Sequence, residues 1–243
     1  MSKGLDYITN IENLIKEVKE TQTDSLKQSA EVIAESLMSD GMIYGFGTGH
    51  SHMLAEELFY RAGGLARVYP ILDEGLMLHS SAAKSTSFER LHGYAEALLN
   101  DYPVKEGDVI IIASNSGRNA VTIEMAMEAK KRGMKVLALT SLKHSRSAAS
   151  RHSSGKRLFE LADVVIDNCG CAGDASIEFE EIGSVGPTST VIGALLLQSI
   201  ICEAVEIMLA NNVKPEVYIS SNVGSGDSNQ ALIDKYKKQI KCL

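Results

Sequence analysis

Two stretches of the chain share one pattern, in which a strand of large apolar residues ends in a loop of small polar residues that begins a helix. The first is MIYGFGTGHS, residues 42–51, and the second is DVIIIASNSGRN, residues 108–119. An uninterrupted apolar run is typical of a strand buried on both faces of a parallel sheet. Small residues leave backbone N–H groups uncovered, and a helix N-terminus attracts negative charge. The pair of loops therefore predicts a site for a phosphate or similar anion.

Strands and helices are predicted to alternate along most of the chain. Strands are expected at residues 42–46, 65–69, 108–113, 135–139 and 163–166, with helices at 51–61, 89–100 and 119–133. The second strand is expected to stop at Pro70, the third to be central, and residues 71–88 receive no element. This alternation predicts an α/β protein, a three-layer αβα sandwich around a parallel sheet with right-handed crossovers.

The ends of the chain are predicted to be helical. Apolar residues recur at helical spacing from Leu5 to Met38, with a polar break near residues 21–24, which indicates two helices. We assign residues 1–40 to this helical pair, packed on the main domain or on a partner subunit, and residues 41–243 to the main domain. A helix capped by hydroxyls is expected from Pro187 to about Leu209, and its apolar surface implies burial by the sheet, a partner subunit or both. A polar loop, residues 222–227, and a helix at 229–240 complete the chain.

Composition narrows the function classes. The formal net charge is -7 and the pI about 5.4, so no nucleic-acid partner is expected. The N-terminus lacks a signal-peptide pattern, and the longest apolar run, residues 191–197, is too short for a bilayer. We therefore expect a soluble cytoplasmic protein with no membrane partner. The four cysteines lack zinc-type spacing and are predicted to be free thiols, and no metal or cofactor is expected.

Together these stretches resemble the SIS (sugar isomerase) domain family of phosphosugar-binding proteins, over residues 40–210. The resemblance is carried by the glycine loop ending in a serine, the Ser-x-Ser-Gly turn at 114–117, the stretch LADVVI at 161–166 and the helix start PTST at 187–190. It implies a five-stranded sheet of flavodoxin-like order, with the first and third strands adjacent and a ligand in the crevice between their loops. The implied phosphosugar-binding residues are Gly47, Thr48, Gly49, Ser51, Ser114, Asn115, Ser116, Gly117, Asn119 and Ser189. Asn119 stands where many members have Thr.

The family includes aldose-ketose isomerases, an amino-sugar phosphate lyase and sugar-phosphate-sensing regulators. Isomerisation needs a base that removes a carbon-bound proton and an acid that serves the neighbouring oxygens. The candidate catalytic residues are Glu56, Glu74, His50 and His79. A Glu on the helix after the glycine loop resembles one used by the phosphoheptose isomerase branch, although the shorter spacing from Ser51 leaves Glu57 open as an alternative, and a Glu near a helix start is often simply solvated.

Several interpretations remain open at the level of sequence. A phosphosugar isomerase is the preferred one, and the alternatives are a non-catalytic sugar-phosphate sensor and an etherase-like lyase. A dinucleotide enzyme is disfavoured because the loop reads Gly-x-Gly-x-Gly instead of Gly-x-Gly-x-x-Gly. The basic stretch at residues 141–157, with Lys143, His144 and Arg146, is either a solvated loop or a flap over the anion. We expect a sugar phosphate as the ligand and a homodimer or homotetramer as the assembly.

Overall fold

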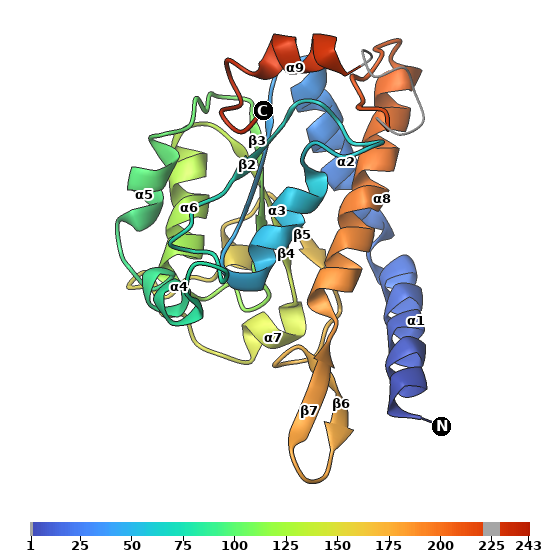
Figure 1. Cartoon of the computed structure of the whole chain (residues 1–243), viewed down its shortest axis with the longest axis vertical. Helices are drawn as coiled ribbons and strands as arrows, with labels where there is room; N and C mark the ends of the chain where they lie inside the picture. Colours follow the sequence, from blue (N-terminus) through green and yellow to red (C-terminus); the bar gives the residue numbers. More distant parts are fainter. Residues whose placement is uncertain (1, 221–228) are drawn as a thin grey trace.

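The computed structural model describes residues 2–220 and 229–243 and contains a five-stranded parallel sheet of order β2-β1-β3-β4-β5 (Figure 1). The strands are β1 (Ile43–Gly47), β2 (Val68–Ile71), β3 (Val109–Ala113), β4 (Lys135–Thr140) and β5 (Val164–Asp167). This is the flavodoxin-like order that was predicted, with β3 in the centre. Because Gly47 at the end of β1 pairs with Ala113 at the end of β3, the loops after both strands leave the sheet side by side.

Helices cover both faces of the sheet and give the predicted three layers (Figure 1). One face packs against α2 (Thr23–Met38), α3 (His52–Leu58) and α8 (Ser189–Ala210), and the other against α5 (Tyr94–Leu99) and α6 (Ala120–Lys131). α1 (Lys3–Thr21) lies beside α8, and α9 (Gln230–Tyr236) lies at the end of the molecule opposite the loops. Shorter helices are α4 (Ala82–Phe88) and α7 (Leu142–Arg146). The domain division at residue 40 stays a prediction.

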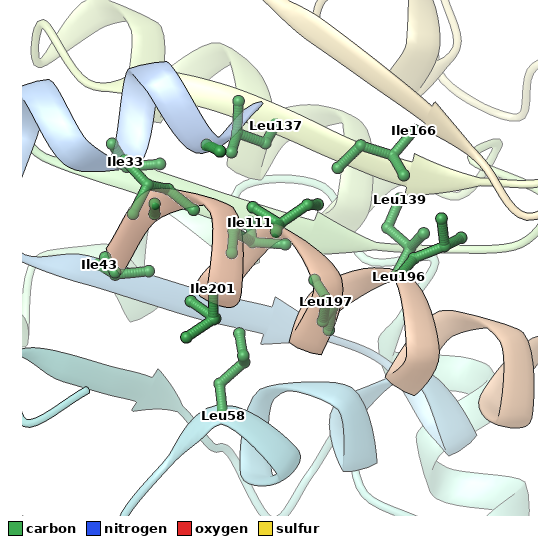
Figure 2. Packing of buried hydrophobic residues seen from close by; sticks show 14 of the residues in the cluster. Ile33, Ile43, Leu58, Ile111, Leu137, Leu139, Ile166, Leu196, Leu197 and Ile201 are labelled. Atoms are coloured by element: carbon green, nitrogen blue, oxygen red, sulfur yellow. The ribbon is translucent and has the colours of Figure 1, made fainter. Parts of the chain in front are cut away.

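The central strand β3 is buried on both faces. Ile111 faces α2 and α8, whereas Ile110 and Ile112 face α5 and α6, and all three side chains are at most 2% exposed. Figure 2 shows side chains of α8, α2 and α3 gathered over the first of these faces. Alternate side chains of a strand point to opposite faces, so a strand covered on both must be apolar throughout.

Helix α8 is long and apolar enough in composition to cross a membrane. In this fold its 22 residues form a core helix that packs on α2 and on the sheet, with one face buried. The buried residues are Ile192, Gly193, Leu196, Leu197, Ile200, Ile201, Ala204 and Met208. Val191 and Leu209 remain exposed. The sheet and α2 therefore bury one face of α8, and burial of its remaining apolar surface by a partner subunit stays a prediction.

Several predicted boundaries were wrong. β2 begins at Val68 and continues through Pro70, which pairs with Gly45. Because β2 is an edge strand, the missing N–H of proline does not interrupt the sheet. The helix expected at residues 89–100 is shorter in the structure. Only α5 forms there, because Gly93, with φ 78°, is the N-cap of α5. The segment without an assigned element contains α4.

The region between β5 and α8 also differs from prediction. No strand was predicted between residue 166 and Pro187, but an antiparallel hairpin of β6 (Ala175–Phe179) and β7 (Gly183–Pro187) forms there and projects from the molecule (Figure 1). Pro187 therefore ends a strand and does not begin α8. The terminal helix spans Gln230–Tyr236 instead of 229–240. The loop predicted at 222–227 lies outside the described residues.

Candidate functional site

The loops after β1 and β3 meet the N-terminus of α8 at one small pocket, here called the inter-loop pocket. Its lining residues are Ser51, Leu54, Ala113, Ser114, Asn115, Leu139, Asn168, Ser189 and Thr190. Four of the ten predicted binding residues are among them: Ser51, Ser114, Asn115 and Ser189. The pocket has a volume of about 10 Å³, about the space that one water molecule needs. The pocket is thus narrow and mostly polar.

The glycine loop is tightly built. A Cβ on Gly47 would lie 2.5 Å from the backbone C and O of Ser51, so only glycine fits there. Gly49 has φ +57°, and its N–H donates to Leu76 O at 2.9 Å. The Thr48 hydroxyl is buried and donates to Glu89 Oε2 at 3.1 Å. Gly47, Thr48 and Gly49 therefore shape the loop, while Ser51 presents its side chain to the pocket.

The Ser-x-Ser-Gly turn is fixed by its own hydrogen bonds. Ser114 Oγ accepts from Gly117 N at 3.2 Å, and Gly117 has φ +56°. Asn115 Oδ1 accepts from Asn168 Nδ2 at 2.8 Å. The Nδ2 group of Asn115 is buried and finds no acceptor within residues 2–220 and 229–243. Ser116, Gly117 and Asn119 belong to the turn but do not line the pocket.

The start of α8 is capped by a carboxylate. Asp174 Oδ1 accepts from the N–H groups of Thr188 and Ser189 at 3.0 and 2.9 Å, and its Oδ2 accepts from the Ser189 hydroxyl at 2.5 Å. The prediction that hydroxyls cap this helix is therefore wrong, since the side chain of Thr188 makes no capping hydrogen bond. Ser189 reaches the pocket with its hydroxyl already paired.

Basic side chains gather at the outer side of the turn. Asn119 occupies the N-cap position of α6 but accepts from Arg151 Nη1 at 2.9 Å instead of capping the helix. The backbone N–H of Arg151 donates to Arg118 O at 2.9 Å, so the segment after α7 lies against the turn. Desolvation lowers the pKa of Arg151, the charges of Arg118 and Arg90 lower it further, and Glu89 opposes them. The turn is therefore a local positive site on an acidic chain.

Glu89 and Arg151 were missed by the sequence analysis. Glu89 contacts the first loop through Thr48, and Arg151 contacts the second through Asn119. The sequence carried no motif that would single out either residue, because each acts through a partner distant in the chain. Lys143 and His144, which were considered as further phosphate contacts, lie on α7.

The four candidate catalytic side chains lie around the glycine loop. Glu56, on α3, is half exposed, and its Oε2 is 3.7 Å from Nε2 of the buried His52. The His52 ring lies 6.4 Å from the His79 ring, centroid to centroid. His50 and Glu74 are exposed in the loops after β1 and β2. None of these four described candidates lines the inter-loop pocket.

The cysteines are free thiols, as predicted. Burial raises the pKa of the Cys169 thiol to about 11, so this group is protonated at neutral pH. A thiol in that state is a poor nucleophile and metal ligand.

A family model for the SIS domain matches residues 6–141, more than half of the chain. The chain therefore belongs to the SIS domain family, as the sheet order and the two loops after β1 and β3 indicate. Its curated relatives include UPF0309 proteins. Those of Listeria monocytogenes serotype 4b (strain F2365) and Thermoanaerobacter pseudethanolicus are each 46% identical over 98% of this chain and over 97% and 99% of their own lengths.

Solved structures with the same fold include two phosphoheptose isomerases. That of Neisseria gonorrhoeae has a TM-score of 0.52 at 18% identity and covers 84% of this chain and 95% of its own. That of Francisella tularensis has a TM-score of 0.55 at 15% identity and covers 84% and 98%. At these identities the comparison establishes the shared fold.

Proposed function

We propose that the chain binds a sugar phosphate at the inter-loop pocket and interconverts its aldose and ketose forms by general acid/base proton transfer. The non-catalytic sensor and the etherase-like lyase are the alternatives. The proposal includes a cytoplasmic homodimer or homotetramer that needs no metal for this reaction.

The composition of the pocket is the observation that carries this proposal. Hydroxyls of Ser51 and Ser114 come from the two loops, and the buried Asn115 Nδ2 is a donor without an acceptor among the described residues. Buried donors are normally paired, so such a group needs an explanation. Phosphate oxygens accept hydrogen bonds only, and they would supply the acceptor. The arginines at the outer side of the turn add favourable potential.

The size of the pocket limits how a phosphoryl group could bind. Because the enclosed volume is about 10 Å³, the phosphoryl group would sit at the mouth, with the Ser51 and Ser114 side chains rotated toward it. The Asp174 carboxylate holds the first N–H groups of α8 and would repel a second anion. Binding is therefore expected to weaken the contact between Asp174 and Ser189.

Two observations favour catalysis over sensing. The His52–Glu56 pair places an imidazole next to a carboxylate at the start of α3, and such pairs serve as proton donors and acceptors. Phosphoheptose isomerases with TM-scores above 0.5 share the fold. We assign Glu56 as the base, with His50, His79 and Glu74 as the groups that could serve the sugar oxygens.

Calorimetric titration tests the binding site. Five- to seven-carbon aldose and ketose phosphates should bind, and the same sugars without phosphate should not. Ser114→Ala should weaken binding about 10- to 100-fold, as expected for the loss of one hydrogen bond to a charged group. Ser199→Ala, which removes an exposed hydroxyl on α8, is the matched control and should bind as the parent does. Equal affinity for the unphosphorylated sugars would reject the phosphate site.

Proton exchange tests the chemistry. An isomerase should exchange the carbon-bound proton of its sugar phosphate with D₂O, which NMR detects. Glu56→Gln should reduce exchange by about 10²- to 10⁴-fold while leaving the dissociation constant nearly unchanged. Glu96→Gln, on exposed α5 surface, is the control. Binding without exchange in the parent protein would favour the sensor, and loss of exchange only in Glu57→Gln would move the base to Glu57.

A further inference from the structure

A second group of reactive side chains lies outside the inter-loop pocket. His92 lies two residues before the start of α5, Glu124 lies on α6, and His152 lies in the segment between α7 and β5. Ligand atoms from the three side chains all lie within 4.8 Å of one another. Three parts of the chain that are distant in sequence thus place two imidazoles and a carboxylate around one point.

The spacing of these atoms suits one bound ion. Glu124 Oε1 lies 2.9 Å from His92 Nδ1 and 3.4 Å from His152 Nε2. Ligands bind zinc at about 2.0–2.2 Å, so neighbouring donor atoms in a tetrahedral site are about 3.3 Å apart. Two imidazoles and one carboxylate form a common three-ligand set for zinc, with a fourth position open to water. The exposed side of His92 leaves room for that water.

Two of the three ligands are oriented by a second group. Gly93 N–H donates to Glu124 Oε2 at 2.7 Å, which leaves Oε1 directed at the imidazoles. Ser154 Oγ lies 2.8 Å from His152 Nδ1. A metal-bound histidine usually donates its second ring N–H to an oxygen, and this contact keeps the other nitrogen free for the ion.

The competing interpretation is a hydrogen-bonded cluster without an ion. In it, His152 Nδ1 accepts from Ser154 N at 3.2 Å, and both imidazoles donate an N–H to Glu124. The two interpretations differ in the tautomer of His152 and in whether added zinc binds.

We propose that His92, Glu124 and His152 bind one divalent transition-metal ion, best matched by Zn²⁺. The ion would join α6 to the segment that carries Arg151, the residue whose side chain reaches Asn119. It would therefore hold that segment against the Ser-x-Ser-Gly turn. This proposal stands independently of the proposed sugar-phosphate function. The sequence analysis predicted no metal because the ligands share no local spacing motif.

Zinc titration of the full chain, after chelator treatment and in competition with a chromophoric chelator, tests the site. The parent protein should bind one Zn²⁺ tightly, and His92→Ala and Glu124→Gln should each weaken this binding by about 100-fold or more. Glu128→Gln, one turn further along α6, is the matched control and should bind as the parent does. His92 is exposed, so its replacement should leave the fold intact.

Two further measurements distinguish metal binding at this site from metal binding by the cysteines. Co²⁺ in the parent should give visible d–d bands without thiolate-to-metal charge transfer, and Glu124→Gln should lose these bands. Zn²⁺ should slow hydrogen exchange at residues 147–157 in the parent but not in Glu124→Gln. Either of two results would overturn the proposal in favour of the hydrogen-bonded cluster. Glu124→Gln would bind zinc as tightly as the parent does, or the parent would bind no zinc at about 100 µM metal.

Discussion

Two glycines of the first loop show how single residues determine the site. Gly47 lies where the backbone of Ser51 returns against β1, and a Cβ would meet backbone atoms at 2.5 Å. Gly49 has nothing within 4 Å of such a Cβ, but its φ of +57° lies in the left-handed region. The first glycine is required by close approach and the second by backbone conformation.

These two reasons predict different losses in the free energy of unfolding when each glycine is replaced by alanine. Gly49→Ala should destabilise the fold by about 1–2 kcal/mol, the strain of a left-handed alanine. Gly47→Ala should cost about 3 kcal/mol or more, because backbone atoms must move to relieve the overlap. Urea unfolding followed by circular dichroism measures both. Equal costs, or the reverse order, would contradict this account of the loop.

At the scale of elements, α8 connects the core to the site. Its middle is buried against the sheet and α2, while its N-terminus opens at the inter-loop pocket. The hairpin of β6 and β7 brings Asp174, which has φ 68°, back to this N-terminus, where its carboxylate accepts from two N–H groups. The hairpin therefore stabilises α8 and places a negative charge beside the pocket.

Replacing Asp174 separates these two effects. Asp174→Ala should destabilise the protein by about 1–2 kcal/mol, because it removes the helix cap. Asp174→Asn keeps an acceptor and tolerates positive φ, so its unfolding midpoint should stay close to that of the parent. If a phosphate binds at the pocket, Asp174→Asn should also tighten its binding severalfold, since a like charge is removed. Unfolding and calorimetric titration give the two values, and weaker phosphate binding in Asp174→Asn would argue against repulsion.

At the scale of the whole molecule, α1 and the hairpin form one extended edge. Tyr7 donates its hydroxyl to Pro187 O at 2.8 Å, and Lys3 Nζ donates to Glu178 O at 2.9 Å, so α1 is tied to both strands. The outer side of α1 exposes Leu5, Ile8 and Ile15. Apolar side chains that recur along one exposed helix face are typical of a protein interface.

The proposed homodimer or homotetramer can be tested at this edge. Leu5→Glu together with Ile8→Glu should lower the molar mass measured by light scattering after size-exclusion chromatography, because charges would be placed in an apolar contact. Lys16→Glu, an exposed residue on α1, is the control and should keep the parent mass. A parent protein that elutes as a monomer would reject the assembly, and a mass unchanged by the double substitution would move the interface elsewhere.

The five strands of the parallel sheet could be located from the sequence because each is a short, mostly apolar run. The run from Val109 to Ala113 is apolar at every position, which is typical of a short strand covered on both faces. The two loops after β1 and β3 could also be predicted from the sequence, since a strand that ends in small residues before a helix exposes N–H groups. Local sequence pattern therefore located the strands of the sheet and the two loops, whereas the strand order and the crevice between the loops were expectations from the resemblance to the SIS family.

The partners of the polar groups were decided only by the tertiary structure. The contacts between Thr48 and Glu89, between Asp174 and Ser189, and of Glu124 with the two histidines join segments distant in the chain. A polar side chain has no preferred neighbour in the sequence, and its partner depends on how the helices and loops pack. For that reason, the sequence by itself determined where an anion would be expected, and the packing decided which side chains reach it.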